Sequence, residues 1–164
     1  MSDPRPVAWL LTGLPGSGKT TFATALARGA VVRLSVDDRM TDLHGRIGKD
    51  HAASDHLALQ APVIEDVRRQ FAALLGEGRS VVLDHGLGTR AVRDDYKGLV
   101  TECGGRWRLV HFQVAHDELL RRLAKRNGEP EHGVISRETL AWIAEHSEAP
   151  VGEGEEPPVL PGSA

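Results

Sequence analysis

The residues with the clearest chemistry lie between Gly13 and Thr20, where the chain reads Gly-Leu-Pro-Gly-Ser-Gly-Lys-Thr. Glycines at this spacing let the backbone fold into a nest whose N–H groups point at one anion. The lysine and threonine that end the nest supply a positive charge for the β- and γ-phosphates of a nucleotide and a hydroxyl for Mg²⁺. The pattern G-x-x-x-x-G-K-[ST] therefore predicts a phosphate-binding loop. The residues predicted to contact ATP are Gly13, Pro15, Gly16, Ser17, Gly18, Lys19, Thr20 and Thr21.

Three carboxylates follow directly on short apolar runs that are typical of buried strands. Asp84 follows residues 81–83, the position of the Walker B carboxylate, and is predicted to bind Mg²⁺ together with Thr20. Asp37 is expected to accept the proton of an attacking hydroxyl, and Asp38 to cap the next helix or to bind substrate. The alternatives are that Asp84 is a turn or N-cap residue and that both Asp37 and Asp38 only cap a helix.

Four cations within six residues are a second source of positive charge for a transferring phosphoryl group. They precede a loop at residues 127–133, so they could belong to a lid that closes over the γ-phosphate. Arg126 is the preferred catalytic arginine because it is nearest to this loop, and Arg122 is the second candidate. A basic, solvated helix face is the alternative interpretation. The four cations are Arg121, Arg122, Lys125 and Arg126.

The eight histidines do not indicate a zinc site, because none forms an H-x-x-x-H pair or a cluster with cysteine. His44 and His85 fall in segments expected to line the acceptor pocket. Together with Asp38 and Arg39 they are the candidate substrate-binding residues. For both histidines an ordinary surface or packing position is the alternative.

Hydrophobic periodicity predicts the elements that position these residues. Short strands alternate with helices along the chain, which predicts an α/β fold with a parallel sheet of four to five strands and helices on both faces. Ligands bind such sheets beyond the carboxyl ends of the strands, where the three carboxylates are expected. Strands are predicted at 7–12, 31–35, 80–83 and 107–114, helices at 20–28, 56–75, 89–102, 116–126 and 136–146, and an irregular or partly helical excursion at 39–55.

Two helices carry more specific expectations. In the second, Pro62 predicts either a start near that residue or a kink. In the third, Thr89 is the expected N-cap, and the side chains expected to face inward are Val92, Tyr96, Leu99 and Val100.

Length and composition favour one domain of 164 residues, with a kinase domain at 1–148 and a flexible, acidic, Pro- and Gly-rich tail at 149–164. From Glu138 onward there are six acidic residues and no Lys or Arg, so this end carries −6 and the preceding residues carry +3. A body this mildly basic, with 4% aromatic residues, is not typical of a nucleic-acid-coating protein. The single cysteine, Cys103, and the lack of a signal-like or membrane-spanning apolar run predict a cytoplasmic protein.

Missing motifs narrow the function further. The chain has no N-K-x-D guanine-reading signature, which argues against a regulatory GTPase. Asp84 is followed by His85 rather than glutamate, so the water-activating pair of many motor ATPases is absent. Of the protein classes that share a phosphate-binding loop, these absences leave a small kinase as the prediction.

The span of about residues 7–147 resembles the small P-loop kinases that include polynucleotide 5′-hydroxyl kinases, zeta-toxin-type kinases and chloramphenicol phosphotransferase. The resemblance implies a P-loop NTPase fold, ATP and Mg²⁺ as cofactors, Asp37 as the base and Arg126 as the lid arginine, with Arg122 as second candidate. It also implies that Asp84 is the acidic residue that ends the third strand. The segments that carry it are residues 13–21, 35–39, 83–86 and 118–126.

Two departures bear on the substrate. Polynucleotide kinases of this group place an arginine three residues after the base, where this chain has Met40, and they usually follow the strand aspartate with Thr-Asn, where it has His85-Gly86. We therefore predict an ATP- and Mg²⁺-dependent phosphotransferase acting on a hydroxyl of a small molecule such as a nucleoside, a sugar or an antibiotic-like compound. The alternatives are a polynucleotide 5′-hydroxyl kinase, with nucleic acid as a less favoured partner, and a non-catalytic ATP-binding sensor or slow ATPase. No membrane partner is expected, and the sequence leaves the oligomeric state open.

Overall fold

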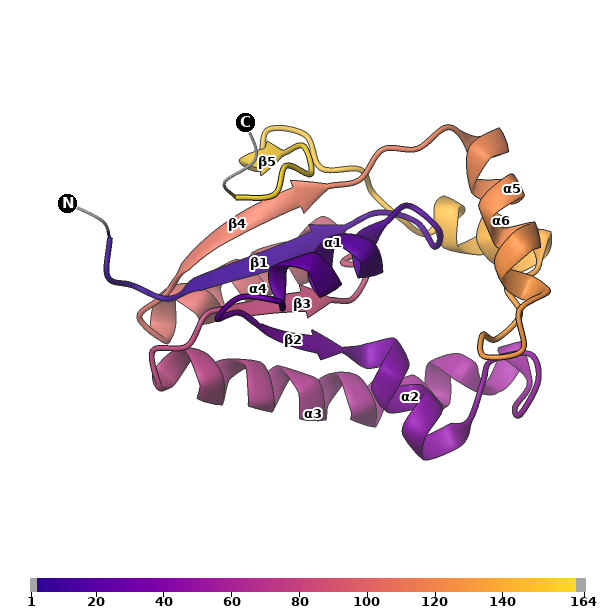
Figure 1. The fold of residues 1–164 in the computed structure, drawn as a ribbon, viewed down its shortest axis with the longest axis horizontal. Helices are drawn as coiled ribbons and strands as arrows, with labels where there is room; N and C mark the ends of the chain where they lie inside the picture. Colours follow the sequence, from indigo (N-terminus) through magenta and orange to yellow (C-terminus); the bar gives the residue numbers. More distant parts are fainter. Residues whose placement is uncertain (1–2, 162–164) are drawn as a thin grey trace.

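Five parallel strands form one sheet in a computed structural model that describes residues 3–161, with helices on both of its faces (Figure 1). The strand order is β2-β3-β1-β4-β5, so the strand that leads into the phosphate loop lies in the middle. The strands are β1 (Val7–Thr12), β2 (Val32–Ser35), β3 (Val81–Asp84), β4 (Arg106–His111) and β5 (Glu155–Glu156). The helices are α1 (Lys19–Leu26), α2 (Val36–His44), α3 (His56–Gly76), α4 (Arg90–Glu102), α5 (His116–Asn127) and α6 (Arg137–Glu145), with a 3₁₀ turn at Ala53–Asp55. The predicted fold class is confirmed.

Alternation along the central strand divides the core into two layers. Ala8 and Leu10 of β1 pack with residues of α2, α3 and α4, whereas Trp9 and Leu11 pack with α1. Successive side chains of a strand point to opposite faces, so an uninterrupted apolar run is what a strand covered on both sides requires. A third cluster joins α5 to α6 through Leu119, Leu123 and Leu140. None of the helices within residues 3–161 is long and apolar enough to cross a membrane.

The region after β2 is more regular than predicted. Helix α2 begins at Val36, directly after the strand, and occupies most of the first half of the expected excursion. Its N-cap is Ser35, whose Oγ accepts a hydrogen bond from the Asp38 N–H at 3.1 Å. The expectation that Asp38 caps this helix is therefore wrong. Val36 and Met40 are one turn apart and both are buried, which anchors the helix to the core.

Helix α3 begins at His56, which confirms the predicted start of the range 56–75, and the alternative start near Pro62 is wrong, so the proline lies inside the helix. In α4 the predicted N-cap is confirmed, since Thr89 Oγ1 accepts from the Val92 N–H at 3.3 Å. The predicted inward face is wrong at one position: Val92 is 40% exposed, and its neighbour Arg93 is completely buried. Residues 93, 96 and 100 share one helix face, so the arginine enters the core on the same side as Tyr96 and Val100.

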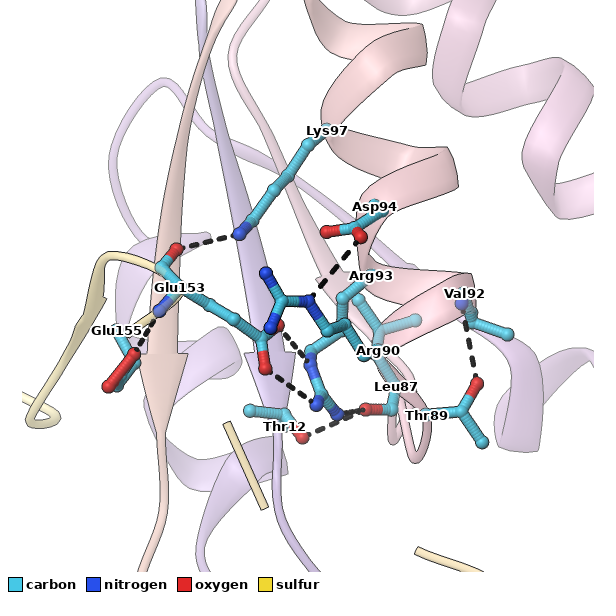
Figure 2. Close-up of polar contacts among 10 residues, drawn as sticks. All are labelled: Thr12, Leu87, Thr89, Arg90, Val92, Arg93, Asp94, Lys97, Glu153 and Glu155. Carbon is cyan, nitrogen blue, oxygen red and sulfur yellow. Dashed lines mark hydrogen bonds and ion pairs between the residues drawn. The ribbon is translucent and has the colours of Figure 1, made fainter. Parts of the chain in front are cut away.

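Arg93 is buried because the C-terminal segment neutralises it (Figure 2). The Glu153 carboxylate accepts from Arg93 Nε at 2.8 Å and from Nη2 at 2.9 Å, and Lys97 Nζ donates to the Glu153 carbonyl at 2.6 Å. Just beyond, β5 pairs with β4. The prediction of a flexible tail at 149–164 is therefore wrong for residues 153–156, and its last three residues lie outside the described range.

The Arg93 guanidinium also contacts the loop after β3, at the edge of the sheet where the phosphate loop begins. Arg93 Nη1 donates to the Leu87 carbonyl at 2.9 Å, and that carbonyl also accepts from Thr12 Oγ1 at 2.9 Å (Figure 2). Thr12 ends β1 and immediately precedes the phosphate loop. One buried side chain thus connects the C-terminal segment, the loop after β3 and the end of β1.

We expect Arg93→Met to lower the free energy of unfolding by about 3–5 kcal/mol, because it leaves the Glu153 carboxylate buried without its partner. Urea unfolding followed by circular dichroism measures the change. Arg90→Met is the matched control on the same helix: Arg90 is exposed and lies 3.7 Å from Asp94, and an exposed pair of this kind contributes about 0–1 kcal/mol. Equal losses in the two variants would contradict a special contribution of the buried pair.

Candidate active site

The phosphate loop occupies residues 13–18, between the end of β1 and the start of α1. Gly16 and Gly18 have φ angles of 84° and 104°, in the left-handed region that glycine adopts without strain. A reverse turn within the loop is closed by a hydrogen bond from the Ser17 N–H to the Leu14 carbonyl at 3.1 Å. The predicted strand, loop and helix are all present in the required order, and the N-terminus of α1 adds its own unpaired N–H groups for an anion.

Lys19 lies at the centre of the charged residues of the site. Its Nζ donates to the carbonyls of Gly13 at 2.7 Å and Leu14 at 3.0 Å. Burial lowers the pKa of this ammonium to about 8; the carboxylates of Asp37 and Asp84 act in the opposite direction, and the charge of Arg126 adds to the lowering. Three residues singled out on separate segments of the sequence are thus close enough to act on the Lys19 charge.

Thr20 and Asp84, the two residues predicted to bind Mg²⁺, contact each other. Thr20 Oγ1 donates to Asp84 Oδ2 at 3.0 Å. A hydroxyl and a carboxylate are hard oxygen donors of the kind that Mg²⁺ prefers, so the two side chains fit this ion.

The sequence analysis missed a residue that shares this carboxylate. Arg33 of β2 contacts the same Asp84 oxygen through Nη2 at 2.6 Å and Nε at 3.1 Å, and its Nη1 lies 2.7 Å from Asp38 Oδ2. Parallel pairing sets Ser35 opposite Asp84, which brings β2 side chains to the end of β3. A charged residue within the short run Val-Val-Arg-Leu-Ser was the available signal.

The two adjacent aspartates of α2 differ in their surroundings. The charge of Asp37 acts on Lys19, His56 and His85, whereas the Asp38 carboxylate is held by Arg33. Both aspartates are exposed, so what separates them is the ion pair that the Asp38 carboxylate forms with Arg33. These differences support the prediction that Asp37, and not Asp38, serves as the base.

His85 is close to these charges, whereas two other predicted substrate-binding residues are not part of the cluster. Burial lowers the pKa of His85, and the charge of Lys19 adds to this, whereas the carboxylates of Asp37 and Asp84 act in the opposite direction. Arg39 Nη2 instead forms an ion pair with Asp66 of α3 at 2.8 Å. His44 ends α2, about 12 Å along the helix from its first residue at the usual rise. The proposed substrate contacts of Arg39 and His44 thus gain no support from their positions.

Helix α5 lies against the phosphate loop. Arg122 Nη1 donates to the Gly16 carbonyl at 3.0 Å, and its Nε contacts Glu118 at 3.0 Å. Arg126 is partly buried, and its charge acts on Lys19. Arg121 is exposed and pairs with Glu118 at 2.5 Å. Arg122 thus contacts the phosphate loop and the charge of Arg126 reaches Lys19, whereas Arg121 pairs with Glu118 on the surface of its own helix.

A cavity of about 500 Å³ opens beside the phosphate loop. The loop, the end of β4 and residues 144–150 form its walls. The Glu148 N–H donates to the Gly88 carbonyl at 2.6 Å, which fixes the segment after α6 over this edge of the sheet. Sequence reasoning assigned residues 149 and 150 to a tail, so it did not identify this wall.

Comparisons with known proteins agree with this geometry. A family model described as an AAA domain matches residues 9–150. No curated protein matches the chain in sequence. Among solved structures, a chain of the Pnkp1/Rnl/Hen1 RNA repair complex is 23% identical with a TM-score of 0.71, and the match covers 88% of this chain and 45% of that one. The chain thus spans less than half of that relative.

Two other solved structures match over most of both chains. A suspected kinase from Chloroflexus aurantiacus is 22% identical with a TM-score of 0.72, covering 92% of this chain and 82% of that one. The Mycobacterium tuberculosis APS kinase CysC, in complex with AMPPNP and APS, is 18% identical with a TM-score of 0.55, covering 82% and 84%. The chain therefore has the fold of P-loop kinases.

We expect nucleotide affinity to fall as the pH rises through about 8, the pKa of the Lys19 ammonium. Phosphates need the protonated lysine, so binding keeps its full strength below this pKa and weakens above it, being about tenfold weaker at pH 9 than at pH 7. Calorimetric titration with MgAMPPNP measures the change. In Lys19→Ala this step should disappear, and an unchanged profile in that variant would assign the titration to another group.

Proposed function

This chain belongs to the AAA domain family, and from the geometry of its site we propose that it is an ATP- and Mg²⁺-dependent phosphotransferase acting on a hydroxyl of a small molecule. The observation that carries the proposal is that Asp37, in the first turn of α2, and Arg126, in the last turn of α5, both lie close enough to Lys19 for their charges to act on its ammonium. A sensor or a simple ATP-binding module needs the phosphate loop but has no use for an accessible carboxylate beside the phosphates.

In the proposed reaction the acceptor hydroxyl attacks the γ-phosphorus of ATP. The new bond joins the acceptor oxygen to that phosphorus, the bond to the β-phosphate oxygen breaks, and ADP leaves. The proton of the hydroxyl passes to the Asp37 carboxylate. Lys19 and Arg126 stabilise the negative charge on the transferred group, and Arg122 keeps α5 against the loop through Gly16.

Thr20 and Asp84 would hold Mg²⁺, which neutralises phosphate charge when it is bound. Arg33 occupies the same Asp84 oxygen as the Thr20 hydroxyl. Its Nε and Nη2 contacts fix the orientation of that carboxylate, so that the other carboxylate oxygen can serve the metal.

The base of the nucleotide would lie in the cavity beside the loop. A volume of about 500 Å³ is typical of a small-molecule site, and its walls combine apolar side chains such as Phe112 with polar ones such as Gln113 and Glu148.

A small acceptor is favoured by the residue three positions after the proposed base. Met40 is 1% exposed and packs in the core, so this position offers no charge to the phosphates of a nucleic-acid chain. The second candidate is a polynucleotide 5′-hydroxyl kinase, which the fold similarity to a chain of an RNA repair complex favours.

We expect Asp37→Asn to lower phosphoryl transfer by about 100-fold to 10,000-fold while MgAMPPNP affinity stays within about threefold, because loss of a general base affects the chemical step. The assay follows label from γ-labelled ATP into pooled nucleosides, sugars, aminoglycoside-like compounds and 5′-hydroxyl oligonucleotides. Asp42→Asn is the matched control, an exposed aspartate on the same helix.

Each outcome of this assay decides a point. Equal transfer by Asp37→Asn and the wild type would remove Asp37 as the base. Transfer mainly to the oligonucleotides would replace the small-molecule proposal with the polynucleotide kinase, and nucleotide binding without transfer to any pool would favour the sensor.

A further inference from the structure

Two loops that are far apart in the sequence lie side by side at the open end of the sheet. Residues 46–51 connect α2 to α3, and residues 129–134 follow the arginine-bearing helix α5 (Figure 1). We call their mutual contact the clasp. It lies outside the cluster of residues assigned to chemistry above.

Hydrogen bonds from both loops form the clasp. The Val134 N–H donates to the Ile47 carbonyl at 2.8 Å, and Lys49 Nζ donates to the Glu129 carbonyl at 3.1 Å. Arg46 Nη1 also donates to the Pro130 carbonyl. All three acceptors are backbone carbonyls, so the clasp does not depend on a particular side chain at the accepting positions.

The two backbones approach so closely that only glycine fits at two of the contact positions. A Cβ at Gly133 would lie 2.6 Å from the Ile47 carbonyl oxygen, and a Cβ at Gly48 would lie 2.9 Å from the Val134 carbonyl oxygen. Both atoms that would be struck belong to the backbone, which cannot move aside as a flexible side chain can. Glycine on both sides of the contact is what a closely fitted interface requires.

Each loop is also braced internally. The Asn127 side chain donates to the Ile135 carbonyl at 2.8 Å and accepts from the Ile135 N–H at 2.9 Å, which closes the base of the second loop. In the first loop, Asp50 Oδ2 accepts from the N–H of Arg46 at 2.7 Å and from its Nε at 2.8 Å. Two braced loops joined through their backbones transmit a displacement better than two flexible ones.

The clasp connects the two halves of the proposed active site. Arg126 immediately precedes Asn127, and residues 46–51 continue from α2, the helix that carries Asp37. We propose that the clasp makes the arginine-bearing lid and the acceptor-side loop one body, so that a nucleotide bound under the lid orders residues 46–51 before the acceptor arrives. Arg46, Gly48 and Gly133 are then positioning residues. This inference rests on the proposed function, because it takes the nucleotide to bind beside Arg126.

Hydrogen–deuterium exchange of the full chain, with and without MgAMPPNP, tests the proposal. In the wild type, MgAMPPNP should slow exchange at residues 13–20 and also at residues 46–51, the latter by about fivefold or more, the lower end of typical coupling between sites. The Gly48 and Asp50 N–H groups are suitable reporters, because both donate within their own loop and not across the clasp.

Gly133→Val is the variant that separates the two loops. It should keep the protection of residues 13–20 and lose that of residues 46–51. Gly128→Ala is the matched control in the same connection, since a Cβ there has no atom closer than 3.5 Å, and it should behave like the wild type. Lys49→Ala removes one clasp bond without adding bulk and keeps the Arg46–Asp50 contacts inside the first loop, so it replaces Gly133→Val if that variant does not fold.

The outcomes of this experiment separate a failure of the clasp proposal from a failure of the proposed phosphotransferase function. Protection of residues 13–20 without protection of residues 46–51 in the wild type would overturn the clasp and leave the nucleotide site intact. Protection of residues 46–51 that persists in both Gly133→Val and Lys49→Ala would overturn it as well. No protection anywhere would remove both the clasp and the proposed kinase.

Discussion

The ion pair and hydrogen bonds of the buried Arg93 guanidinium are the interactions on which the edge of the sheet beside the candidate active site depends. A charge without solvent access is tolerated only when it is paired and its hydrogen-bond donors are used. Glu153 supplies the opposite charge, and the Leu87 carbonyl accepts a further donor. The same Leu87 carbonyl also accepts a hydrogen bond from Thr12 Oγ1. The hydrogen bonds of Arg93 therefore help to fix the end of β1, from which the phosphate loop starts.

A second set of charges surrounds the phosphate loop, and its members are more accessible. Cations and carboxylates alternate there: Arg33 neutralises Asp84 and Asp38, and the carboxylate of Asp37 acts on the Lys19 ammonium. Lys19 donates to two carbonyls of its own loop, so phosphates compete with weak neutral acceptors for a full positive charge. The arrangement favours an anion without leaving a buried cation unpaired.

The accessible and the buried charges have different consequences. The pair of Arg93 and Glu153 gives the scaffold a rigid edge, whereas Lys19, Asp37 and Arg126 lie where a ligand can change their partners. The clasp at residues 46–51 and 129–134 adds a connection on the outer side of the site, made by a backbone hydrogen bond, the side chains of Arg46 and Lys49, and a close approach at two glycines. The phosphate loop, held through the contacts of Arg93, lies on one side of the proposed substrates. The two loops of the clasp, which we propose to move together, lie on the other.

The sequence by itself determined the features that depend on local spacing or periodicity. The phosphate loop, the strands that lead to Asp37 and Asp84, and the N-cap Thr89 follow from neighbours within a few residues of each other. Regular apolar periodicity and the strand-and-helix alternation were enough for the fold class, and the general rule for parallel sheets was enough to bring the carboxylates to one edge.

Only the tertiary structure decided the pairings between distant segments. Arg33 meets Asp84 across 51 residues, and Arg93 meets Glu153 across 60, and no periodic pattern connects either pair. The acidic end of the chain has the composition of a disordered segment. Glu153 is nevertheless buried, because it forms an ion pair with Arg93 of α4. Arg39 was adjacent to the proposed base in sequence but faces Asp66 on α3, since neighbouring residues of a helix point in different directions. Local spacing specifies which groups can do chemistry, and long-range packing decides which of them meet.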